Sequence, residues 1–60
     1  MNNKYTYSIH PSGYITIKNL LNQTVAAIDC EEQLSFTKES STVVRQEVKE
    51  FLDMHDIAYF

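Results

Sequence analysis

The chain has 60 residues, a net charge of −3 and one cysteine, Cys30, which lies between acidic neighbours. One small domain, 1–60, is the most that this length supports, and such a domain buries only about 60% of the surface that its unfolded chain exposes. The lone thiol excludes an internal disulfide, its acidic neighbours disfavour the reactive thiolate, and no apolar run approaches the roughly 18 residues of a membrane span. We therefore expect a cytoplasmic protein that gains stability from a partner chain.

The first predicted element is a hairpin between strands at about 4–10 and 14–19. Pro11 fixes φ near −65°, as the second position of a type I turn requires, and Gly13 accepts the left-handed conformation that closes the loop. The resulting three-residue loop puts apolar side chains on one face and polar ones on the other, whereas a two-residue loop mixes the faces. The predicted pairs are Tyr5 with Asn19, Thr6 with Lys18, Tyr7 with Ile17, Ser8 with Thr16, and Ile9 with Ile15.

A third strand is predicted at about 24–29, which completes a meander with one buried side. A four-residue loop, 20–23, with Asn22 in the left-handed conformation, continues the apolar face of the hairpin. The predicted pairs are Ile17 with Ala26 and Ile15 with Ile28. The next stretch, 30–37, is compatible with either a short strand or an extended link.

Residues 41–55 are predicted to form an amphipathic helix, with Ser40 or Ser41 as its N-cap. Its apolar side chains recur at helical spacing and form one stripe, which packs on the apolar face of the meander. The stripe consists of Val44, Val48, Phe51, Leu52 and His55. A short strand at 57–60 follows, and it can pair either within the sheet, for example on the free edge of the first strand, or with a second copy of the chain. Together the elements predict an α+β fold in the order strand, strand, strand, helix, strand.

The charges are distributed unevenly along the chain. Residues 1–28 contain no Asp or Glu, whereas 29–60 contain all eight acidic residues. An acidic C-terminal half is typical of a chain with a solvated acidic helix, and it would also suit binding to a partner protein with a basic surface. Aromatic side chains add to this interpretation because protein interfaces are enriched in them. The predicted protein-binding residues are Tyr14, Glu47, Glu50, Asp53, Tyr59 and Phe60.

The sequence predicts no catalytic, metal or cofactor site. His10, His55 and Cys30 lack a recognised ligand spacing, and a domain of this size has little room for a substrate pocket of about 300 Å³ or more. We therefore expect a non-enzymatic protein-binding module, such as an acidic inhibitor or accessory protein of a phage or other mobile element that acts on a host protein. A homodimer is compatible with the small core. The alternative is a nucleic-acid-binding regulator that uses the sheet tyrosines and lysines, which the negative net charge disfavours.

Overall fold

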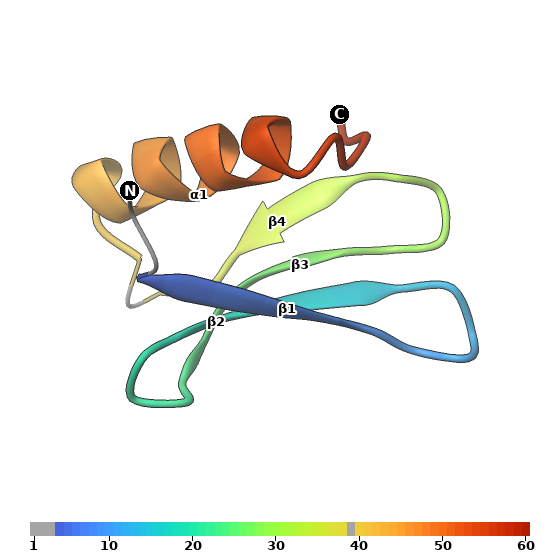
Figure 1. The fold of residues 1–60 in the computed structure, drawn as a ribbon, viewed down its shortest axis with the longest axis horizontal. Coiled ribbons are helices and arrows are strands. Elements are labelled where there is room, and N and C mark those ends of the chain that lie inside the picture. The colour runs from blue at the N-terminus through green and yellow to red at the C-terminus, as the bar shows by residue number, and fades with distance from the viewer. Residues whose placement is uncertain (1–3, 39) are drawn as a thin grey trace.

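The computed structural model describes residues 4–38 and 40–60. Four strands precede one helix: β1 (Tyr5–Ile9), β2 (Ile15–Asn19), β3 (Thr24–Ile28), β4 (Leu34–Phe36) and α1 (Thr42–Met54). The strands form one antiparallel sheet in the order β1-β2-β3-β4, and α1 lies across one of its faces (Figure 1). This arrangement confirms the predicted α+β class and the packing of a single helix on a meander.

The first hairpin has the predicted register. All five predicted pairs between β1 and β2 are present, from Tyr5–Asn19 to Ile9–Ile15. Gly13 has a φ of 101°, and its N–H donates to the carbonyl of His10 at 2.9 Å. The turn is therefore the type I turn with a left-handed closing residue that the positions of proline and glycine predicted.

The second hairpin differs from the prediction in its loop. The pairs Ile15–Ile28 and Ile17–Ala26 are confirmed, but the register shifts after Ile17 so that Lys18 pairs with Thr24. The loop is only three residues long, 20–22, because the N–H of Asn19 already donates to the carbonyl of Gln23 at 3.0 Å. The residue that the loop loses is accommodated in β3 as a β-bulge at Val25. The pairs beyond the bulge therefore remain as predicted although the loop is shorter.

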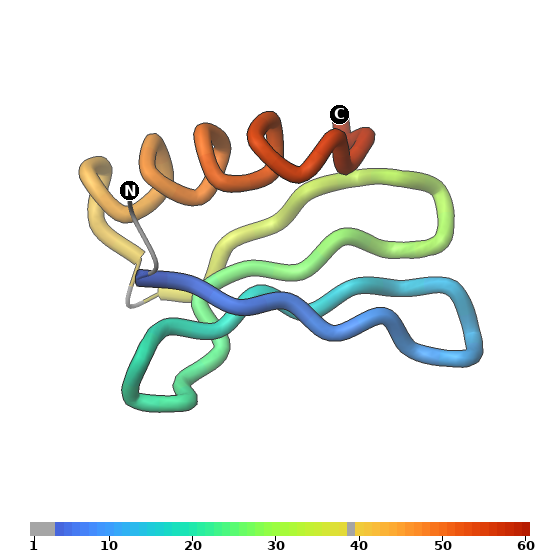
Figure 2. Tube along the Cα trace, in the orientation of Figure 1, coloured from blue at the N-terminus to red at the C-terminus, as the bar shows by residue number. Residues whose placement is uncertain are grey.

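The side chains of Asn19 and Asp29 explain why the later turns are as tight as the first. The Oδ1 atom of Asn19 accepts hydrogen bonds from the N–H groups two and four residues ahead, and Oδ1 of Asp29 does the same in the β3–β4 turn. Each turn also has a left-handed residue at the same place, Asn22 with a φ of 64° and Glu32 with a φ of 66°. Figure 2 shows the β1–β2 and β3–β4 turns at one end of the sheet and the β2–β3 turn at the other.

The stretch 30–37, for which strand and link were both possible, contains β4. The predicted strand at 57–60 is wrong, since these residues have no regular secondary structure. They do not lie on the edge of β1 either: the N–H of Phe60 donates to the carbonyl of Glu32 at 2.7 Å, and the carbonyl of Phe60 accepts from the N–H of Leu34 at 3.1 Å. This pair of bonds resembles one step of a parallel ladder on the outer side of β4.

The ends of α1 explain why the chain turns back at this point. Ser41 is the N-cap and accepts from the N–H of Val44 at 3.2 Å, while Ser40 is buried and donates to the carbonyl of Val25 at 2.6 Å. At the other end, Asp56 has a φ of 55°, and the N–H of Ile57 donates to the carbonyl of Leu52 at 3.0 Å. These are features of a Schellman motif, which ends the helix and folds the following residues back.

The core lies between the sheet and α1. It contains side chains from the first three strands and the helix: Tyr5, Ile17, Val25, Ala26, Ile28, Val48, Phe51 and Leu52. Four members of the predicted helical stripe pack here, and Val44 is the half-buried one among them. His55, the fifth member, is exposed but keeps its ring 4.6 Å from that of Phe51. The opposite face of the sheet is not covered by any described element.

Candidate functional site

The outer edge of β1 is a free sheet edge among the described residues, because β1 has β2 as its neighbour on one side and no strand on the other. The N–H of His10 donates to the carbonyl of Tyr14 at 2.8 Å, which fixes the alternation of the ladder. In an antiparallel pair every second residue bonds to the neighbouring strand, so Ser8 and Thr6 also bond to β2. The N–H and C=O groups of the residues between them, Tyr7 and Ile9, therefore point outward. Unpaired groups of this kind are a template for another strand.

The opposite edge of the sheet is protected. Strand β4 has only three residues, and the outward N–H of Leu34 already donates to the carbonyl of Phe60. The guanidinium of Arg45 also lies over the ring of Phe36, 5.3 Å from its centroid. Short edge strands and covered edges are common ways to prevent pairing with another chain. Of the two edges of the sheet, the β1 edge is therefore the one that the described residues leave open to another strand.

A groove runs between β1 and the flank of α1, and we call it the edge groove. It consists of two hollows of about 340 Å³ and 50 Å³ that share Tyr5 and Phe51. The residues that line it are Tyr5, Thr6, Tyr7, Glu47, Glu50, Phe51, Met54 and His55. The two elements that form it run in the same direction, as the tube in Figure 2 shows. Because its two hollows share Tyr5 and Phe51, the edge groove is continuous beside the first residues of β1.

Aromatic rings form the floor of the edge groove. The ring of Tyr7 lies 6.0 Å from that of Phe51 and 5.3 Å from that of His55, in edge-on contacts. Tyr7 nevertheless keeps 39% of its surface exposed, Met54 keeps 61%, and Ile9, beyond the groove on the same face of β1, keeps 67%. Apolar surface left open beside unpaired backbone groups is typical of sites where another chain packs.

A hydrogen-bonded cluster of Lys4, Tyr5 and Glu47 anchors one end of the edge groove. The hydroxyl of Tyr5 donates to Glu47 Oε1 at 2.8 Å, and Nζ of Lys4 lies 3.0 Å from Oε2. Burial, and then the neighbouring Glu47 carboxylate, raise the pKa of Tyr5 to about 12. The hydrogen bonds from Lys4 and Tyr5 lower the pKa of Glu47. Glu47 is therefore held ionised and already satisfied, whereas Glu50 has no ion-pair partner among the described residues.

The six predicted protein-binding residues do not form one surface. Glu47 and Glu50 line the edge groove. Asp53 accepts a hydrogen bond from the hydroxyl of Tyr59 at 3.4 Å; Tyr59 is half-buried against the core, and its pKa is raised by burial and then by Asp53. The other two lie elsewhere: Phe60 is 83% exposed beside β4, and Tyr14 lies at the β1–β2 turn.

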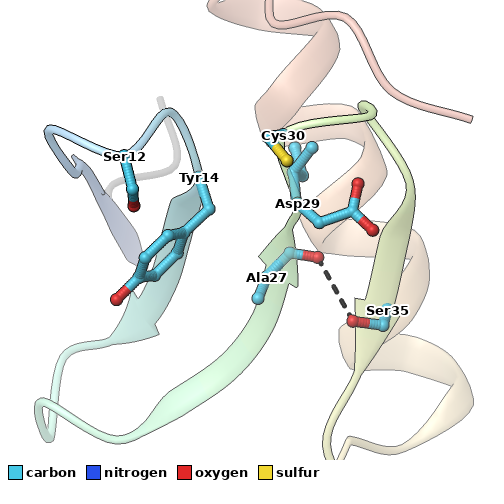
Figure 3. Close-up of a pocket in the computed structure, with 7 residues that line it drawn as sticks. Ser12, Tyr14, Ala27, Asp29, Cys30 and Ser35 are labelled. Carbon is cyan, nitrogen blue, oxygen red and sulfur yellow. Dashed lines mark hydrogen bonds between the residues drawn. The ribbon is translucent and has the colours of Figure 1, made fainter.

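A separate hollow lies on the uncovered face of the sheet (Figure 3). It has a volume of about 250 Å³ and is lined by Ser12, Tyr14, Ala27, Ile28, Asp29, Cys30 and Ser35. The ring of Tyr14 stacks on His10 at 4.0 Å, and the Ser35 hydroxyl donates to the Ala27 carbonyl at 3.4 Å. One pair of polar groups in this hollow is therefore already hydrogen-bonded, and Cys30 is a free, exposed thiol that also lines it.

The nucleic-acid alternative relied on tyrosines and lysines gathered on one sheet surface. Tyr5 and Tyr7 instead lie on the side that faces α1, and Lys4 is paired with Glu47. This leaves Lys18 with Tyr14 on the uncovered side. That is a small basic surface for a ligand whose binding depends on several neutralised phosphates.

No pattern in the sequence predicted a binding surface at Tyr7, Ile9, Met54 or His55. Tyr7 and Ile9 alternate with Tyr5 as core-facing residues do, so their pattern indicated burial. Their exposure arises because α1 covers the start of β1 more than its end. That offset depends on the helix position, which the spacing of apolar residues leaves open.

No protein-family model matches the chain, and comparison with curated proteins and with solved structures also gave no significant match. Within residues 4–38 and 40–60, no helix combines the length and the apolar composition needed to cross a bilayer. The same residues hold no group of three or more His, Cys, Asp or Glu side chains placed to bind a metal ion. The candidate site therefore rests on the geometry of the β1 edge and the edge groove.

Proposed function

We propose that the protein is a non-enzymatic binding module that holds another protein at the free edge of β1 and in the edge groove. The observation that carries the proposal is the coincidence of outward backbone groups at Tyr7 and Ile9 with exposed apolar side chains on the same face. Backbone pairing supplies affinity in such complexes, and contacts to alternate side chains supply selectivity.

An inhibitory or accessory role, acting on a host protein in the cytoplasm on behalf of a phage or other mobile element, extends this proposal. The acidic residues Glu50 and Asp53 on α1 favour a partner with a basic surface. The exposed free thiol of Cys30 fits a reducing compartment such as the cytoplasm.

The test is affinity capture from the source cell with the wild-type chain and with Ile9→Lys. A lysine at an edge position blocks strand addition, and Ile9 is exposed enough for the fold to accept it. We expect the Ile9→Lys chain to lose at least about nine-tenths of the partner captured by the wild type, which corresponds to more than 1.4 kcal/mol of binding free energy.

Leu21→Lys is the matched control, since Leu21 is 77% exposed and lies in the β2–β3 turn at the other end of the sheet. This variant makes the same change of charge and removes a similar apolar side chain. Capture that is retained by Ile9→Lys, or lost equally by both variants, would contradict the proposal.

A further inference from the structure

The residue types along the edge groove restrict what kind of segment can occupy it, if β1 binds a partner as proposed above. Antiparallel pairing is the more stable arrangement per residue, so we take it for the added strand. Its residues opposite Ile9, Tyr7 and Tyr5 would form the backbone hydrogen bonds and turn their side chains toward α1. These three positions therefore determine the selectivity.

The first two of these positions are apolar. Ile9 is mostly exposed, and Tyr7 lies beside Phe51 and His55 in the wider part of the edge groove. A side chain placed opposite either residue would rest on hydrocarbon and aromatic surface. Aliphatic, β-branched residues suit both positions because they also favour the extended conformation.

The third position is acidic. Tyr5 shares the narrow part of the edge groove with Glu47, Glu50 and Met54. Glu47 is already neutralised by Lys4 at 3.0 Å, while Glu50 is exposed and has no ion-pair partner among residues 4–38 and 40–60. A lysine or arginine opposite Tyr5 would extend its stem along Met54 and bring its charge to Glu50.

We propose that the occupant of the β1 edge is an extended basic segment of another protein, with an apolar residue, a spacer, an apolar residue, a spacer and then a lysine or arginine. The same charges disfavour a second copy of the chain as the occupant. In a second copy, β1 has no lysine or arginine to place beside Glu50, and two chains of net charge −3 repel each other.

The probe is the peptide acetyl-Thr-Ile-Thr-Val-Thr-Lys-Thr-amide, titrated into the 15N-labelled protein and followed by NMR. We expect the largest amide shifts at Tyr5, Tyr7 and Ile9. A peptide of the same composition in reverse order, acetyl-Thr-Lys-Thr-Val-Thr-Ile-Thr-amide, should bind at least about fivefold more weakly. Equal or tighter binding of the reversed peptide would overturn the assigned order.

Glu50→Lys should weaken binding of the probe at least about tenfold, which corresponds to about 1.4 kcal/mol. Glu31→Lys is the matched control because it makes the same substitution at an exposed position in the β3–β4 turn. Shifts confined to the uncovered face of the sheet, or an equal loss in both variants, would overturn the proposal. Self-association of the free protein that shifts the Tyr7 and Ile9 amides as the protein concentration rises would also overturn it, because it would place a second copy on the edge.

The two proposals fail in different ways. If Ile9→Lys abolishes capture of a cellular partner but the probe peptide does not shift the β1 amides, the proposed binding module is supported. The proposal that its occupant is a basic extended segment is then wrong. If Ile9→Lys retains the partner, the module itself is placed wrongly, whatever the peptide does.

Discussion

Three residues in the hairpin turns hold the left-handed backbone conformation, and they differ in how well they tolerate it. Gly13 does so at no steric cost, and Asn22 is among the residue types that accept it. Glu32, with a φ of 66°, has a side chain that disfavours this conformation. Its conformation is imposed by the turn, in which the N–H of Glu32 donates to the carbonyl of Asp29 at 2.9 Å.

Gly13→Val should lower the free energy of unfolding by about 1–2 kcal/mol. The cost comes from the backbone and not from crowding, since an added Cβ would meet its nearest neighbour, Cβ of Cys30, at an ordinary 3.8 Å. Urea denaturation measures the change, with Ser12→Ala in the same turn as the control. Equal midpoints for the two variants would contradict the turn assignment.

Glu32→Gly should act in the opposite direction and raise the free energy of unfolding by about 0.5–1 kcal/mol. The gain is the left-handed strain that glycine avoids, less the entropy that glycine loses on folding. Chemical denaturation again measures it, and Glu31→Gly is the control because Glu31 is not in the left-handed conformation. A loss of stability in Glu32→Gly larger than in the control would show that its side chain has a role of its own.

The pH dependence of stability should reveal the hydrogen-bonded hydroxyl of Tyr5. Its pKa is raised from 10.0 to about 12 in the folded chain, so the folded state keeps the proton that the unfolded state releases. The contribution is fully present below pH 10 and is lost as the pH rises from 10 towards 12. Tyr5→Phe, which has no proton to lose, should show a shallower alkaline decline in thermal melts. Superimposable alkaline limbs for the two proteins would contradict this assignment.

At the scale of elements, the turn residues made the register of the first hairpin predictable, and the helical stripe made it predictable that α1 packs on the sheet. Residue spacing did not predict how side chains and left-handed residues would act on the backbone beyond the first hairpin and the helix N-cap. Asn19 shortened the second loop and produced the bulge at Val25, and the left-handed Asp56 turned 57–60 away from a strand. Such effects depend on which of several possible hydrogen bonds forms, and residue spacing does not decide that.

Phe51→Ala should be among the most destabilising single changes, at about 3–5 kcal/mol. Phe51 is buried and contacts the rings of Tyr5, Tyr7 and His55, so it joins β1 to α1. This loss is comparable to the whole stability expected of so small a domain. Glu50→Ala, at the preceding residue of the helix, should change stability by less than about 0.5 kcal/mol. A thermal melt of Phe51→Ala that matches the wild type would contradict the packing of α1.

At the scale of the whole molecule, the described residues cover one edge of the sheet and leave the other open, and the proposed function depends on that asymmetry. Glu50 was predicted as a binding residue from charge alone, and the structure places it in the edge groove. The apolar part of the groove was not predictable, because α1 leaves Ile9 exposed only through its offset from β1. Binding surfaces of this kind consist of residues that remain exposed after the helix has packed on the sheet.

Amide hydrogen exchange in the free protein tests the open edge most directly. If the edge is open, protection along β1 alternates: the N–H groups of Thr6 and Ser8, which bond to β2, should exchange at least about tenfold more slowly than those of Tyr7 and Ile9, which point outward. Uniformly slow exchange along β1, at the level of the central residue Ile17, would mean that another chain segment already covers the edge, and it would contradict the proposal that this edge awaits a partner.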